Sequence, residues 1–324
     1  MAGLRLVDAG SLVHRVRSGL AASVHRRIAG DDFDAAHERI WNTPGPRRFT
    51  PDHAIWRVHT DTAMFVGGIR ALLLQSLHPV AMQAVSDHSG FRGDPWGRLH
   101  RTSHYLATTT YGTDHDASRA IARVRGIHRR VHGTMPDGTP YRADDPRLLI
   151  WVHIAEVDSF LATHQRYGAT PLTDAGVDDY LADTAQVAAD LGVPEPPTDR
   201  RMLDRQLASF RPELRCTEPA REARDLLLRN PPLPAAARAG YRLLAAGAIA
   251  TLPAWARAEL SLPTLPVTDR VLAAPATRLA LGALRWALAA TTDDGDDRLA
   301  TGDATGDGTA DRADGAADQP GRVA

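Results

Sequence analysis

Three polar groups in the segment from Arg98 to Glu156 have residue types that can bind a cofactor or take part in a reaction. They are Arg98-Leu-His-Arg101-Thr102, a lone His128, and His153-Ile-Ala-Glu156. An imidazole nitrogen can ligate iron, and a guanidinium group can pair with a carboxylate or polarise a bound oxygen species. Each such group, if buried, needs a partner or a ligand to offset its desolvation. The sequence therefore predicts that the function lies in this segment.

The spacing of apolar residues directs both histidines into a helical core. The stretch 117–133 carries apolar residues and His128 at the three-and-four spacing of one helix face, namely Ile121, Val124, Ile127, His128 and Val131. A second predicted helix starts at Asp145-Pro146, a cap followed by proline, and places His153 on an apolar face that includes Leu149, Ile150, Val157, Phe160 and Leu161.

The Arg98 segment follows a loop rich in glycine, and its polar residues share one side of a predicted helix. Arg98, Arg101 and Thr102 stand at i, i+3 and i+4, so they are neighbours on the surface of that helix. From spacing alone two interpretations stay open: a binding group held by a rigid helix, or a solvated basic edge.

Several reaction classes are excluded or weakly supported by the motifs. All 38 basic residues are arginine, so Schiff-base and P-loop lysine chemistry are excluded. The sequence has no GxSxG elbow, no HExxH and no nucleotide glycine signature. The reversed His153-x-x-Glu156 pair supports a di-iron site only weakly. A haem needs one or two protein ligands because the macrocycle supplies four nitrogens, and histidines satisfied within the core are the plain alternative.

Composition favours an all-α protein with a single large helical domain. We expect an N-terminal helix or arm over residues 1–30, the helical domain over residues 31–290, and a disordered acidic tail over residues 291–324, in which nine Asp face three Arg. A single cysteine, Cys216, rules out an internal disulfide and fits a cytoplasmic location. The N-terminus lacks the apolar region of a secretory signal. Nucleic-acid binding is not expected, and contact with a membrane surface is not predicted.

Two long apolar stretches are interrupted by proline. Pro79 should end or kink the helix that begins near Phe65, close to Gln75, and Gly67 and Gly68 would allow a backbone or a flat ligand to approach closely. His78 either serves a site or bonds to the backbone that the proline frees. The second stretch, residues 241–260, contains Pro253 and should form a buried helical hairpin.

Several sequence blocks carry a resemblance to a known family. GGIRALLLQSLHPVAMQAV, DPWGRLHRTSHYLATTTYGT, VRGIHRRVHG and DPRLLIWVHIAEVDSF, all within about residues 56–168, strongly resemble the catalytic domain shared by MpaB-type oxygenases and rubber oxygenases (latex-clearing proteins). A weaker similarity extends this to about residues 30–270. The resemblance implies an all-helical fold, a b-type haem as in rubber oxygenase, and cleavage of carbon-carbon double bonds of isoprenoid chains by dioxygen.

The same resemblance implies roles for individual residues. The family's Arg-x-x-Lys-Thr motif matches Arg98, Arg101 and Thr102, and its proximal histidine matches His128. Arg101 stands where rubber oxygenase has lysine, which keeps the charge but alters its geometry and removes an exchangeable proton. His153 lies in a WVH block typical of shorter members, as a second haem ligand or a pocket group.

The expectation is thus a haem b-dependent oxygenase that uses dioxygen on an apolar, isoprenoid-like substrate. His128 would ligate the iron, His153 and Arg98 would also bind the cofactor, and Arg98, Arg101 and Thr102 would act in catalysis. One alternative is a non-catalytic protein that binds haem or a hydrophobic ligand, with a six-coordinate iron held by His128 and His153. Another is a helical protein that binds neither haem nor oxygen.

Overall fold

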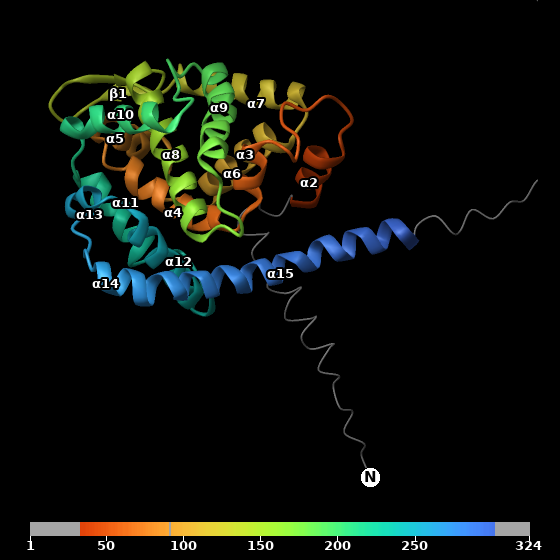
Figure 1. Ribbon diagram of the computed structural model, residues 1–324. Helices are drawn as coiled ribbons and strands as arrows, with labels where there is room; N and C mark the ends of the chain where they lie inside the picture. The colour runs from red at the N-terminus through yellow and green to blue at the C-terminus, as the bar shows by residue number, and fades with distance from the viewer. Residues whose placement is uncertain (1–32, 91, 302–324) are drawn as a thin grey trace, which may run out of the picture.

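The computed structural model describes residues 33–90 and 92–301, and helices account for nearly all of its regular structure (Figure 1). In chain order the elements are α2 (Phe33–Asn42), α3 (Ala54–Thr60), α4 (Ala63–Gln75), α5 (Pro79–His88), α6 (Pro95–Tyr111), α7 (Asp114–His128), β1 (His132–Thr134), β2 (Pro140–Arg142), α8 (Pro146–Tyr167), α9 (Asp174–Leu191), α10 (Arg200–Phe210), η1 (Arg211–Glu213), α11 (Glu218–Leu228), α12 (Ala235–Thr251), α13 (Ala254–Glu259), α14 (Pro266–Thr268), η2 (Asp269–Ala273) and α15 (Ala274–Thr301). The predicted all-α class is confirmed. The predicted arm over residues 1–30 lies outside the described residues.

The core is organised around α4 and α8, which make the most extensive contact between any two described elements. A methyl group built on Gly67 of α4 would lie 2.8 Å from Phe160 Cδ1 and 2.8 Å from Thr163 Oγ1 of α8, so the two backbones meet at this glycine. Nothing lies within 4 Å of the same position on Gly68. The predicted close approach is therefore made by a neighbouring helix, and only at Gly67.

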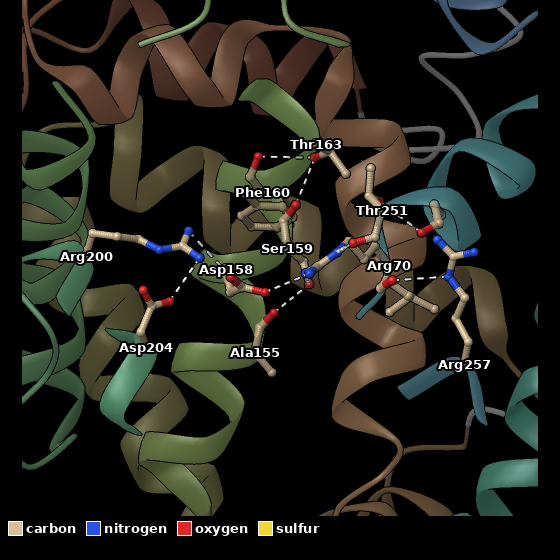
Figure 2. A network of polar contacts seen from close by, with 12 residues as sticks. Arg70, Ala155, Asp158, Ser159, Phe160, Thr163, Arg200, Asp204, Thr251 and Arg257 are labelled. Atoms are coloured by element: carbon tan, nitrogen blue, oxygen red, sulfur yellow. Dashed lines mark hydrogen bonds and ion pairs between the residues drawn. The ribbon is translucent and has the colours of Figure 1, made fainter. Parts of the chain in front are cut away.

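A buried ion pair joins the same two helices (Figure 2). Arg70 Nη2 of α4 lies 2.7 Å from Asp158 Oδ2 of α8, and Arg70 Nη1 donates to Ser159 Oγ at 2.6 Å. Arg70 Nε donates to the carbonyl oxygen of Thr251 at the end of α12. Neither charged side chain is more than 7% exposed, so Arg70 depends on Asp158 for its compensation, and Asp158 depends on Arg70 and on a longer contact with Arg200 at 3.9 Å.

Pro79 has the predicted effect on the first apolar stretch. The helix α4 ends at Gln75, α5 begins at Pro79, and their axes differ by 107°. His78 is the N-cap of α5, and its Nδ1 accepts a hydrogen bond from the Ala81 backbone at 3.4 Å. The His78 side chain therefore caps α5, whereas the Gln75 carbonyl oxygen that Pro79 frees accepts a hydrogen bond from Trp151 Nε1 at 3.2 Å. No single described helix is long and apolar enough to cross a membrane, although α4 and α5 taken together meet that test of length and composition.

Capping residues set where the site-bearing helices start. Asp94 accepts a hydrogen bond from Gly97 N at the start of α6, and Asp145 accepts one from Arg147 N at the start of α8. Gly168 N donates to His164 O at the end of α8. The helix start at Asp145-Pro146 is confirmed, since α8 begins at Pro146.

The end of α7 differs from the prediction. The helix stops at His128, five residues before the predicted Gly133, because a short antiparallel hairpin follows it. Residues 132–134 pair with residues 140–142, with Gly133 opposite Tyr141. A methyl group on Gly133 would lie 2.5 Å from the Tyr141 hydroxyl oxygen, so the hairpin needs glycine here. The turn signals after Gly133 therefore belong to a β-hairpin.

The C-terminal helices cover one end of the α4–α8 pair (Figure 1). The predicted hairpin over residues 241–260 appears as α12 and α13, separated at Pro253. The final helix α15 runs from Ala274 to Thr301 and so extends into the predicted acidic tail over residues 291–324, whose remainder lies outside the described residues. Cys216 is a half-buried free thiol that contacts both the main core and a smaller cluster around Met82, and burial raises its pKa.

Candidate functional site

The helices α6, α8 and α9 bring Glu156 close to two tyrosines. The charge of Glu156 raises the pKa of Tyr105 on α6 and that of Tyr180 on α9, in both cases as a contribution second to burial. Burial raises the pKa of Glu156 itself to about 7. No cation among the described residues counteracts this shift. Near neutral pH the Glu156 carboxyl is therefore partly protonated and partly charged.

His153 lies one helical turn before Glu156, on the same side of α8. Burial lowers the pKa of His153 to about 4, which keeps the imidazole neutral at physiological pH. Its Nε2 atom is buried and has no hydrogen-bond partner within the part of the chain that the structure describes. A neutral imidazole with an unpartnered nitrogen is the form that can ligate a metal.

His128 is the last residue of α7 and is half-buried. Burial lowers its pKa, while the charge of Asp144 raises it in part, and its Nδ1 has no hydrogen-bond partner. The predicted apolar face around His128 is only partly correct, because Ile121 is buried whereas Ile127 is 44% exposed. The early end of α7 explains this, since the chain turns into the hairpin directly after His128.

The arginine motif lies on α6 with its members in different surroundings. Arg98 is half-buried and donates to Ser89 Oγ at 2.8 Å. Burial and the charge of Arg101 both lower the pKa of Arg98, and no carboxylate of the described residues is a hydrogen-bond or ion-pair partner of Arg98. Arg101 is exposed and lies 3.5 Å from Asp94, and the exposed Thr102 donates to the carbonyl oxygen of Arg98.

Tyr105 lies on the same side of α6 as Arg98, and the sequence analysis did not name it. Tyr105 follows Arg98 by seven residues, two helical turns, and therefore projects to the same side at about 10 Å along the axis. Its hydroxyl is buried without a hydrogen-bond partner, as is that of Thr108. The seven-residue spacing from Arg98 could have identified Tyr105 from the sequence. No sequence pattern could have identified Tyr180, because it comes close to Glu156 only when α9 packs beside α8.

The unpartnered atoms fit a haem better than a bare metal ion. Within residues 33–90 and 92–301, no three His, Cys, Asp or Glu side chains gather in a way that could hold a metal ion. The reversed His153-x-x-Glu156 pair therefore lacks further protein ligands. Haem needs none beyond one or two imidazoles, and its propionates need a cation such as Arg98. Two unpartnered imidazole nitrogens and an arginine without a carboxylate match that demand.

Fold and site together define an all-helical protein whose half-buried histidines, carboxyl group and two tyrosines are carried by α6, α7, α8 and α9. The chain belongs to the family described as ER-bound oxygenase mpaB/B'/Rubber oxygenase, catalytic domain, whose model matches residues 56–303. This confirms the resemblance noted from the sequence blocks, and it makes the chain a member of an oxygenase family.

Two curated proteins are similar to part of the chain. They are Uncharacterized protein Mb2261 of Mycobacterium bovis and Uncharacterized protein Rv2237 of Mycobacterium tuberculosis, each 34% identical over 131 residues. The matched segment is 40% of this chain and 51% of each relative, so the chain spans about half the length of the curated relatives it matches. No solved structure matches the chain.

Proposed function

We propose that this chain is a haem b-dependent oxygenase that acts with dioxygen on an apolar, isoprenoid-like substrate. The family supports oxygenase activity in general. The observation that supports the haem is the presence of two neutral histidines, His128 and His153, each with a buried nitrogen that finds no hydrogen-bond partner among residues 33–90 and 92–301. A buried unpartnered nitrogen costs free energy, and ligation of iron would offset that cost.

Each residue of the motif has a role in this proposal. His128 would hold the iron, and His153 would be either a second haem ligand or a group of the pocket. Arg98 would pair with a haem carboxylate, because its guanidinium is half-buried and lacks a carboxylate. Arg101 adds positive charge beside Arg98, and Thr102 completes the motif at the surface.

Glu156 extends this proposal beyond the motif. Haem iron would supply the activation of dioxygen when bound. Because the pKa of Glu156 is about 7, its carboxyl can hold or release a proton near neutral pH. Tyr105, whose hydroxyl has no hydrogen-bond partner among the described residues, lies near enough to Glu156 for the carboxylate charge to raise the Tyr105 pKa. We propose that these two side chains orient the substrate or an oxygen atom by hydrogen bonding.

The test is the absorption spectrum of the purified full-length chain, expressed with adequate haem, with pyridine haemochrome quantification. We expect a Soret band for the wild type, loss of most bound haem in His128→Ala, and a smaller loss in His153→Ala. The variant His132→Ala, in the hairpin beside α7, serves as a control for a general effect of removing a histidine. A wild-type protein that stays colourless and takes up no added haem would contradict the proposal.

The two unpartnered imidazoles also favour a second candidate, a haem-binding protein without turnover. Ligation by both His128 and His153 would give a six-coordinate, low-spin iron and leave no open position for dioxygen. Oxygen consumption with isoprenoid alkenes separates the two candidates. The oxygenase predicts uptake that depends on the alkene, whereas the binding protein predicts a low-spin spectrum and no uptake.

A further inference from the structure

A second polar site lies at the other end of α8 from His153. It is a pocket of about 490 Å³ lined by residues from α3, the α3–α4 connection, the C-terminal part of α8 and α15, among them Arg57, Asp61, Thr62, His164, Arg285 and Leu288. His164 follows His153 by eleven residues, which places it roughly 16 Å farther along the helix axis. The pocket is therefore separate from the candidate haem site.

Three side chains that line this pocket have buried polar atoms without a hydrogen-bond partner. They are Thr62 Oγ1, His164 Nδ1 and Arg285 Nε. Thr62 is 7% exposed and His164 is 2% exposed, so water does not reach these side chains freely. Thr62 is also the N-cap of α4, yet its hydroxyl makes no capping hydrogen bond. Polar atoms left open together in one pocket indicate a ligand that would satisfy them.

The charge of the lining indicates the kind of ligand. Asp61 is the pocket's acidic residue, and its oxygens already accept hydrogen bonds from Ala63 N, Ala169 N and Arg285 Nη2 at 2.7 Å, 2.7 Å and 2.9 Å. Arg285 Nη2 also donates to Tyr167 O. The groups that remain open are mainly donors, from Arg57, Arg285 and Thr62, and donors of this kind bind anionic oxygens.

We propose that this pocket binds a small molecule with one carboxylate or phosphate group on a short apolar body. The anionic group would accept hydrogen bonds from Arg57, the free N–H of Arg285 and the Thr62 hydroxyl. The apolar body would lie against Leu288 and Ala289 of α15, which line the same pocket. Such a ligand joins α15 to the α3–α4 connection, and the inference holds whether or not the chain binds haem.

The experiment is isothermal titration calorimetry on the full-length protein with three probes. Octanoate carries both the charge and the apolar body, inorganic phosphate carries the charge alone, and n-octanol carries the body alone. We expect octanoate to bind and n-octanol to bind at least about tenfold more weakly, because the alcohol leaves the arginines unpaired. Inorganic phosphate that binds as tightly as octanoate would show that the apolar body adds nothing to binding, and would overturn the proposal of a ligand with an apolar body.

Two variants connect the binding to this pocket. Thr62→Val removes the open hydroxyl at nearly constant volume, and Arg57→Gln removes an exposed charge, so neither should prevent folding. Each should weaken octanoate binding by about tenfold. The conservative Thr62→Ser keeps the hydroxyl and should keep the affinity, as should Arg119→Gln on the exposed side of α7.

The outcomes decide the proposal in either direction. If neither octanoate nor phosphate gives a heat of binding, the proposal is overturned. Binding of n-octanol as tight as that of octanoate also overturns it. Binding that both Thr62→Val and Arg57→Gln leave unchanged places the anion elsewhere and also overturns it. The melting temperature of unliganded Thr62→Val is an independent readout: it should equal or exceed that of the wild type, because the variant no longer buries an unsatisfied hydroxyl.

Discussion

At the scale of single residues, His59 is an imidazole that the fold keeps neutral. Its Nδ1 lies 2.9 Å from Thr110 Oγ1, and its Nε2 lies 3.4 Å from the Tyr180 hydroxyl. Burial lowers the pKa of His59 to about 3, with a further contribution from His164. Charging His59 would therefore oppose the packing of α3 against α9, the two helices that carry it and Tyr180.

This neutral histidine predicts a loss of stability in mild acid. The unfolded chain binds a proton on His59 near pH 6.5, but the folded chain does so only near pH 3. Between these values the unfolded state holds more protons, so the free energy of unfolding falls as the pH falls. From pH 6.5 to about pH 5 the contribution of His59 is on the order of 2 kcal/mol.

The measurement is urea unfolding of the wild type and of His59→Gln at both pH values. The wild type should lose more stability than the variant over this interval, by up to the amount given above. The same variant at pH 7.5 reports the loss of the Thr110 and Tyr180 contacts alone. Equal losses in the two proteins between pH 6.5 and pH 5 would show that His59 is not protected from protons in the folded state.

At the scale of elements, the contact between α4 and α8 depends on one glycine of an adjacent pair. Gly67 faces Phe160 and Thr163 of α8, whereas the next residue, Gly68, has open space where a methyl group would be. Gly67→Ala should destabilise the fold by about 1–3 kcal/mol, because the helices must separate or their side chains must leave their rotamers. Gly68→Ala should stabilise it by about 0.5–1 kcal/mol, through helix propensity.

These two variants differ by one position on the same helix, so each serves as the control of the other. Thermal unfolding monitored by circular dichroism should move the two melting temperatures in opposite directions. A fall for both, by a similar amount, would contradict the assignment of Gly67 as the point of close approach.

At the scale of the whole molecule, Arg70 joins three segments that are far apart in the sequence (Figure 2). It pairs with Asp158, donates to Ser159 and donates to the carbonyl oxygen of Thr251, so α4, α8 and α12 share one guanidinium. Arg70→Met should cost up to about 3–5 kcal/mol, because the buried Asp158 loses its close partner and keeps only the longer ion pair with Arg200, at 3.9 Å. The loss is measured by equilibrium denaturation.

The double variant Arg70→Met/Asp158→Leu tests the physical reason for that loss. With both charges removed, no unpaired ion remains buried, and much of the lost stability should return. A double variant as unstable as Arg70→Met would mean that the hydrogen bonds to Ser159 and Thr251, and not the stranded carboxylate, account for the effect.

The sequence predicts the helices of this molecule well because their signals are local. The cap at Asp145-Pro146, the break at Pro79 and the left-handed Gly192 that ends α9 each depend on a few neighbouring residues. The predicted end of α7 was wrong by five residues, because the pairing of Gly133 with Tyr141 in the hairpin competes with the helical pattern. Long-range pairing of this kind leaves little trace in periodicity.

The candidate site was predictable in part for the same reason. Arg98 and the two histidines were visible as types and spacings, and the family match places them within an oxygenase catalytic domain. The raised pKa of Glu156 and its proximity to Tyr180 could not be predicted, since they depend on how α9 packs beside α8. An unpartnered atom such as His153 Nε2 is defined by the absence of neighbours in space, which no linear pattern records.

The thiol of Cys216 has a consequence for how the motions of this fold can be followed. It is the only thiol in the chain, and it is half-buried where α11 meets the core, in contact with both hydrophobic clusters. Because part of the thiol is covered, a thiol reagent should react faster when α11 separates from its neighbours, so a change in labelling rate reports a change in that local opening. The molecule thus carries a built-in reporter of partial unfolding, which requires no engineered cysteine and reads one specific junction.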